Sequence, residues 1–210
     1  MSPTPRGSRN NALRYIPAGF VILRFVLGPL LWWDAHLGMP SPWFIIGFVT
    51  AGLTDLFDGI IARRLDSVTV ELREWDGRVD VWFYFWIALS VWSTHADILQ
   101  TYTIPLLFVL GLQMLAWLID LIKFRRFSNY HAYSAKALGF ALFGATLALF
   151  AFNEVGILLW LAIGAGTICM LEEIAITLTL PQWMYDVPSI LHARRLRTEL
   201  LNERTGVSEL

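Results

Sequence analysis

Six long apolar segments, separated by short polar connections, account for most of the chain. Each is long enough to cross a bilayer core of about 30 Å as a helix, which takes roughly 20 mostly apolar residues. Membrane β-barrels instead show segments of about ten residues with alternating polarity, and this sequence lacks them. The pattern therefore predicts an all-α integral membrane protein, a bundle of six transmembrane helices. The expected spans are residues 18–36, 42–62, 76–94, 98–122, 134–152 and 156–180.

The membrane domain extends over residues 18–180, and the segments before and after it are more polar. Residues 1–17 contain Arg and Pro but no long apolar run, so we do not expect a cleavable signal peptide there. Residues 181–210 mix apolar and basic positions, and we expect them to form an amphipathic C-terminal tail.

Positive charges predict the orientation of the spans. Fifteen of the sixteen Lys and Arg residues lie in or beside the terminal segments and the connections after spans two and four. The other three connections contain none, and the remaining basic residue is Arg24, inside the first span. Lys and Arg are enriched in cytoplasmic loops. We therefore expect both termini to be cytoplasmic and the protein to lie in the cytoplasmic (inner) membrane.

Composition excludes several other classes of protein. Hydrophobic residues make up 56% of the chain and charged residues 16%, against about 25% charged in a typical soluble protein. The net charge of −1 provides no basic field, so we expect no nucleic-acid partner. The single Cys169 excludes an internal disulfide and a multi-cysteine metal site, and we interpret it as small apolar filler.

Four aspartates lie near the predicted cytoplasmic ends of spans two and three. Asp55 and Asp58 are three residues apart and Asp76 and Asp80 are four apart, so each pair shares one helix face. Four converging carboxylates would repel one another without a cation. Oxygen ligands favour Mg²⁺ or Mn²⁺ over zinc or copper. The alternative is four separate interfacial acids, each paired with an arginine. It would not explain why both pairs of aspartates are in helical phase and at the same membrane depth.

Small residues and an arginine follow the second of these aspartates. Gly59 comes directly after Asp58, and Ala62 and Arg63 come one turn later. Small residues let a ligand approach the backbone, and an arginine binds phosphate oxygens through two N–H groups. Beside a carboxylate-bound metal, this pattern indicates phosphoryl or pyrophosphate chemistry.

Residues 55–80, DLFDGIIARRLDSVTVELREWDGRVD, resemble the signature of the CDP-alcohol phosphatidyltransferase family. That signature is DxxDGxxAR, followed after about eight residues by GxxxDxxxD. Leu72 stands where the family has its second Gly, which bears on how closely a nucleotide can pack there. Seven positions match, namely Asp55, Asp58, Gly59, Ala62, Arg63, Asp76 and Asp80.

The first span resembles the family more weakly. Pro17, Arg24 and Pro29 fit a pattern found in many members, whereas Ala18 and Val21 replace its Asn and Thr. The residues alone leave two interpretations of Arg24: its side chain snorkels to the interface, or it pairs with an acid inside the bundle.

The resemblance implies roles for the four aspartates. Asp55, Asp58 and Asp76 would bind one divalent ion, Mg²⁺ or Mn²⁺, and Asp55, Asp76 and Asp80 a second. Asp80 would also be the general base that takes the proton of an acceptor hydroxyl, which attacks the β-phosphorus of a CDP-lipid and releases CMP.

The resemblance also implies a donor site and an assembly. Gly59, Ala62, Arg63 and Thr69 would contact the CDP part of a donor such as CDP-diacylglycerol. The product would be a phospholipid, made at the cytoplasmic face from the donor and a small alcohol. Family members are homodimers, so we expect a homodimer without assigning its interface.

The acceptor alcohol is read from residues outside the signature. Lys136, Arg126 and His131 lie in a basic segment between spans four and five, and a basic pocket there would suit glycerol 3-phosphate or an inositol phosphate. Contact with anionic headgroups is the alternative for this segment. Glu172 and Glu173, inside span six, would pair with Arg24 or Lys136 or favour an amine-bearing acceptor. These indications conflict and leave the acceptor open.

Two other classes of function share some of these features. A divalent-metal transporter would use acids of the same kind, but it needs polar groups distributed through the membrane depth. A non-catalytic membrane scaffold would retain the fold without the activity. Confinement of the main acid cluster to one interface favours an enzyme. Asp120 lies near a predicted span end, and we interpret it as an ordinary interfacial residue.

Overall fold

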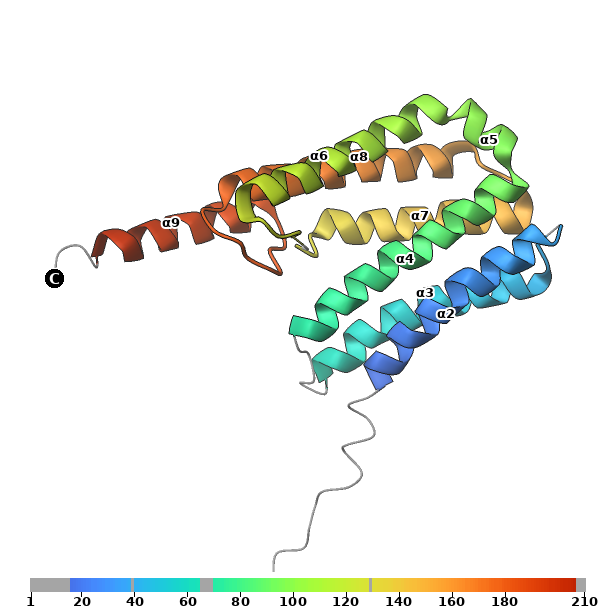
Figure 1. Cartoon of the computed structure of the whole chain (residues 1–210), viewed down its shortest axis with the longest axis horizontal. Helices are drawn as coiled ribbons and strands as arrows, with labels where there is room; N and C mark the ends of the chain where they lie inside the picture. The colour runs from blue at the N-terminus through green and yellow to red at the C-terminus, as the bar shows by residue number, and fades with distance from the viewer. Residues whose placement is uncertain (1–15, 39, 65–69, 129, 207–210) are drawn as a thin grey trace, which may run out of the picture. The chain divides into compact units, whose positions relative to one another are not determined.

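The computed structural model describes residues 16–38, 40–64, 70–128 and 130–206, and all regular secondary structure in these ranges is α-helical (Figure 1). This confirms the all-α prediction. The chain forms two compact units, which meet in sequence between Gln100 and Thr101. The first unit contains α2 (Ile16–His36), α3 (Pro42–Arg64), α4 (Val70–Thr94) and α5 (Ala96–Thr101). The second contains α6 (Thr103–Phe124), α7 (Tyr133–Phe152), α8 (Gly156–Thr179) and α9 (Ile190–Gly206).

The helix boundaries lie within two residues of four of the six predicted spans, and α4 ends where predicted but begins six residues before the predicted span 76–94. The remaining span is the segment 98–122, where the structure has two helices, α5 and α6, separated at Tyr102. Pro105 explains the break. It has no N–H to donate to the carbonyl of Thr101, four residues earlier, and its ring would clash with that carbonyl. Pro105 is instead accommodated in the first turn of α6.

Four helices are long and apolar enough to cross a membrane: α2 from Ala18, α6, α7 and α8. Helix α3 provides a shorter apolar stretch, Pro42–Phe57. Helix α4 is not one of these four over its described residues, and Asp76, Arg78 and Asp80 lower its hydropathy there. The count of six spans and the cytoplasmic placement of both termini remain predictions.

Small residues bring the helices of the first unit close together. Helix α2 packs against both α3 and α4 (Figure 1). A β-carbon on Gly47 of α3 would lie 2.8 Å from Leu31 Cδ2 on α2, and one on Gly28 of α2 would lie 3.0 Å from Trp86 Cδ1 on α4. At the turn between α2 and α3, the Asp34 carboxylate accepts hydrogen bonds from the backbone N–H and hydroxyl of Ser41. The position of Arg24 on α2 is thereby set relative to both acid-bearing helices.

Helix α8 is the central element of the second unit. It contacts α6, α7 and α9. Gly166 of α8 faces Val109 of α6, where a β-carbon would lie 3.1 Å from Val109 Cγ1. Cys169 is buried and its Sγ lies 3.9 Å from a carboxylate oxygen of Glu173, one turn along the same helix.

Asp120 is a buried structural residue, so its interpretation as an ordinary interfacial acid was wrong. Only 5% of it is exposed. Its two oxygens accept hydrogen bonds from the Ser128 backbone N–H and the Thr177 hydroxyl, both 2.8 Å long. Because the Thr177 hydroxyl donates to Asp120, the Tyr130 hydroxyl, 2.8 Å away, must donate to Thr177. Burial raises the pKa of Tyr130, so this donor stays protonated at neutral pH. The network joins α6, the connection after it and α8.

Two further polar contacts connect α8 to its neighbours. Lys123 Nζ donates to the backbone oxygens of Thr177 and Leu178. Both lie in the last turn of α8, where backbone carbonyls have no N–H partner further along the helix. Glu172 accepts a hydrogen bond from the backbone N–H of Ile190, the first residue of α9. A carboxylate at that end of a helix also interacts favourably with its dipole. The first turns of α9 are then covered by an apolar cluster: Tyr130, Ala132, Ile176, Leu180, Val187 and Ala193.

We expect Thr177→Val to destabilise the second unit. The substitution keeps the shape of the side chain but removes one hydrogen bond to a buried carboxylate and the acceptor of the Tyr130 hydroxyl, a loss of about 1–3 kcal/mol in the free energy of unfolding. Thermal unfolding of the purified protein in detergent measures it. Thr177→Ser retains the hydroxyl and is the matched control. Equal unfolding midpoints for Thr177→Val and the wild-type protein would contradict a stabilising role for the network.

Candidate active site

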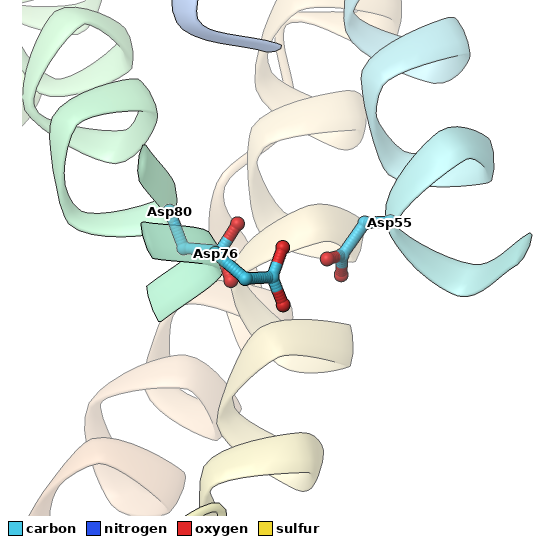
Figure 2. Close-up of side chains that lie close together, drawn as sticks. All are labelled: Asp55, Asp76 and Asp80. Atoms are coloured by element: carbon cyan, nitrogen blue, oxygen red, sulfur yellow. The ribbon is translucent and has the colours of Figure 1, made fainter. Parts of the chain in front are cut away.

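Three carboxylates from two helices converge in the first unit. Asp55 lies on α3, and Asp76 and Asp80 lie one turn apart on α4. Figure 2 shows the three side chains directed toward one another from these helices. One carboxylate oxygen from each lies within 4.8 Å of those from the other two. The spacing of four residues on α4, read from the sequence as a shared face, therefore produces the convergence of Asp76 and Asp80 with Asp55.

A buried arginine lies at the centre of this aspartate cluster (Asp55, Asp76 and Asp80). Arg24 of α2 is 1% exposed. Its Nη1 atom donates to Asp55 Oδ1 at 2.5 Å and also to Asp80 Oδ1, and its Nη2 atom donates to Asp76 Oδ1 at 2.5 Å. This contact confirms the interpretation that Arg24 pairs with an acid inside the bundle and excludes snorkelling. The partners of Arg24 in these three contacts are aspartates of the same unit.

The cluster has more negative charge than Arg24 can balance. Three ionised carboxylates and one guanidinium leave a net charge of −2. Asp55 is the most accessible member, with 52% of its side chain exposed, against 24% for Asp76 and 38% for Asp80. The cluster is therefore open on the side of its carboxylates and closed on the side of Arg24. A ligand of positive charge can approach it from that open side.

The donor set fits a hard divalent cation. Asp55, Asp76 and Asp80 supply only oxygen atoms, and Mg²⁺ and Mn²⁺ prefer oxygen ligands. A separation of 4.8 Å or less is compatible with a shared ion, because two oxygens on opposite sides of Mg²⁺ are separated by about 4 Å. These three residues are the ones that would hold the metal.

The remaining residues of the signature lie partly outside the described structure. The backbone of Asp58, Gly59, Ala62 and Arg63 belongs to α3, but their side chains lie outside the described residues, and Thr69 lies outside them altogether. The same holds for the side chain of Leu72 on α4. The roles expected for these residues therefore stay predictions.

The candidate acceptor residues belong to the second unit. The Arg126 guanidinium lies over the Trp183 ring, 5.1 Å from its centroid, and Lys136 Nζ lies 5.3 Å from the centroid of Tyr133. His131 has a positive φ of 50° in the connection between α6 and α7. Their expected role in acceptor binding stays a prediction, since their structural contacts do not identify a ligand.

Tyr84 is a neighbour of the cluster that the sequence analysis missed. It lies one turn beyond Asp80 on α4 and interacts electrostatically with Asp55, Asp80 and Arg24. The continued spacing of four residues through Asp76, Asp80 and Tyr84 was the signal for it, because positions at this interval share a helix face. A hydroxyl on that face adds a polar group beside the carboxylates.

The family model for CDP-alcohol phosphatidyltransferase matches residues 14–179. The match extends through both units, from the start of α2 to the end of α8, and stops before α9. No curated protein and no solved structure matches the chain. A match over this much of the chain, together with the convergence of the signature aspartates, assigns the chain to an enzyme family and decides against a transporter or a scaffold. The chain belongs to the CDP-alcohol phosphatidyltransferase family, integral membrane enzymes that transfer a substituted phosphate group from a CDP-alcohol to an acceptor alcohol and release CMP.

Proposed function

We propose that the protein transfers a phosphatidyl group from a CDP-lipid such as CDP-diacylglycerol to the hydroxyl of a small alcohol, with phosphate-bearing alcohols as the first candidates. The main observation in support is the convergence of Asp55, Asp76 and Asp80 beside Arg24. The cluster concentrates negative charge where two divalent ions would bind a diphosphate. The acceptors that best fit a basic pocket are glycerol 3-phosphate and an inositol phosphate.

The proposed reaction is an in-line displacement at the β-phosphorus. Asp80 accepts the proton of the acceptor hydroxyl, whose oxygen forms a bond to the β-phosphorus. The bond from that phosphorus to the bridging oxygen breaks, and CMP leaves with the oxygen. Divalent ions held by Asp55, Asp58, Asp76 and Asp80 would supply electrostatic stabilisation of the charge that develops on the phosphate oxygens. Gly59, Ala62, Arg63 and Thr69 would hold the CDP part of the donor.

The proposed topology places this chemistry at the cytoplasmic face of the inner membrane. Helices α3 and α4 are 23 and 25 residues long, above the roughly 20 that a span requires. Their charged residues gather toward one end, so each can cross the bilayer with its polar end at the interface. With α2, α6, α7 and α8 this makes six spans, and the distribution of Lys and Arg favours cytoplasmic termini. The proposed assembly is a homodimer.

The direct test of this function is release of CMP from CDP-diacylglycerol by the purified protein in detergent, with a panel of alcohols. We expect release that requires Mg²⁺ or Mn²⁺ and that is fastest with a phosphate-bearing alcohol. Asp76→Asn should lower turnover by at least about 100-fold, because it removes a charged ligand from the phosphate site. Asp34→Asn is the control, since Asp34 holds the turn after α2, ten residues beyond Arg24. Metal-independent release, or full activity of Asp76→Asn, would contradict the proposal.

Asp80→Asn tests the assignment of the general base. Asn keeps the size of the side chain but cannot accept the proton, so we expect a loss of about 10²–10⁴-fold in kcat. The affinity for the CDP-lipid should fall much less, because the other aspartates remain. Turnover is measured as a function of Mg²⁺ concentration. If excess Mg²⁺ restores nearly wild-type turnover, Asp80 is a metal ligand and not the base.

Lys136→Gln tests the proposed acceptor site. Loss of a charge-assisted hydrogen bond of about 1.5–3 kcal/mol should raise KM for a phosphate-bearing acceptor by roughly 10–100-fold, with KM for the CDP-lipid nearly unchanged. Lys123→Gln removes an equal charge from a side chain that binds the carbonyl end of α8, and it should lower thermal stability without this effect on KM. An unchanged acceptor KM in Lys136→Gln would remove that residue from the site.

A further inference from the structure

Arg24 is the residue of the cluster whose role the reaction does not explain. Its guanidinium is buried and contacts all three carboxylates at once, although it comes from a third helix. A guanidinium has five N–H donors in a planar fork, which suits contact with several carboxylates. Without Arg24, the three carboxylates would lose the one guanidinium that contacts all of them.

Arg24 and a cation at the cluster would compete for the same carboxylates. Arg24 contacts Oδ1 of each aspartate. A divalent ion needs carboxylate oxygens at about 2.0–2.1 Å and brings twice the charge of a guanidinium. Two positive groups at the centre of the same oxygens would repel strongly in a site that is closed on one side. Full contact of Arg24 with all three carboxylates therefore competes with direct ligation of a metal by the same oxygens.

We infer that Arg24 is the resident counter-ion of the metal-free site and that a divalent cation loads by displacing its guanidinium from at least one carboxylate. The inference rests on the proposed metal-binding role of the cluster. Arg24 thus stabilises the empty site, and its release opposes cation binding. The residue sets the concentration of Mg²⁺ at which the site fills, and it protects the fold when the cation is absent.

Two consequences of this competition are measurable without turnover. Removal of Arg24 takes away the guanidinium that the three carboxylates share, which destabilises the protein when no cation is bound. The same removal eliminates the competitor, so the cation should bind more tightly and should stabilise the variant more than it stabilises the wild-type protein. A residue that merely oriented the ligands for the metal would have the opposite effect on affinity.

The experiment is a titration of the full-length protein in detergent with Mn²⁺, with free Mn²⁺ measured by electron paramagnetic resonance. We expect Arg24→Gln to bind Mn²⁺ roughly 10-fold more tightly than the wild-type protein or better, within the usual range of coupling between two ligands of one site. Arg24→Lys keeps the charge but loses the planar fork, so its affinity should lie between the two. Arg78→Gln is the matched control. It removes an equal charge from an exposed side chain on α4 that lies over Trp75, and its affinity should change by less than about 3-fold.

Thermal unfolding of the same proteins completes the test. In EDTA, Arg24→Gln should unfold at a lower temperature than the wild-type protein, and Mn²⁺ should raise its midpoint by a larger amount. Folding of Arg24→Gln only in the presence of Mn²⁺ would also support the competition. If Arg24→Gln folds under neither condition, the Mn²⁺ affinity of Arg24→Lys tests the competition, and it should exceed that of the wild-type protein.

Weaker Mn²⁺ binding by the Arg24 variants than by the wild-type protein would overturn the inference and make Arg24 a residue that positions the ligands. Failure of the wild-type protein and of every variant to bind Mn²⁺ is a different result. It would contradict the metal-binding role in the proposed function itself, with Arg24 left as the partner in a structural ion pair.

Discussion

A charged side chain buried on an apolar helix needs compensation within the protein, and in the first unit this constraint on Arg24 links α2 to α3 and α4. An uncompensated charge at membrane depth costs several kcal/mol. Arg24 is buried on α2, a helix apolar enough to cross a membrane, and the aspartates of α3 and α4 compensate its charge. The close approach of the helices at Gly28 and Gly47 allows this contact. Three carboxylates share this one guanidinium, which is the basis for proposing that the cluster also binds a cation.

The second unit meets the same constraint with structural hydrogen bonds. Asp120 is buried, but its two oxygens receive donors from Ser128 and Thr177. Lys123 binds the carbonyl end of α8, and Glu172 binds the first N–H of α9. The contacts of Lys123 and Glu172 thus stabilise the end of α8 and the start of α9. In the first unit, by contrast, three acids converge on one arginine.

Much of the fold was predictable from the sequence because length and apolarity identify membrane helices directly. The boundaries of α2, α3, α7 and α8 lie within two residues of the predicted spans. The break at Tyr102 was missed because the apolar pattern continues through it, although Pro105 marks it locally. The burial of Asp120 was missed because its partners, Ser128 and Thr177, are separated from it by 8 and 57 residues. No local sequence pattern indicates a contact between residues as far apart as Asp120 and Thr177.

The aspartate cluster was predictable from the spacing of its members on α3 and α4, which places them in helical phase. The partners of Arg24 were not predictable from the sequence, because one arginine in an apolar run is compatible with both snorkelling and an ion pair. Only the packing of α2 against two other helices distinguishes these alternatives. The acceptor pocket has no comparable pattern. The contacts of Arg126 and Lys136 with aromatic rings serve the fold and do not identify a ligand.

The proposed chemistry requires that the aspartate cluster beside Arg24 bind a divalent metal. Determination of a crystal structure with bound Mn²⁺, located by its anomalous scattering, tests this most directly. We expect an anomalous peak within direct bonding distance of carboxylate oxygens of Asp55, Asp76 and Asp80, with the Arg24 guanidinium withdrawn from at least one of them. A fully loaded protein with the peak elsewhere, and with Arg24 still bound to all three aspartates, would contradict this expectation.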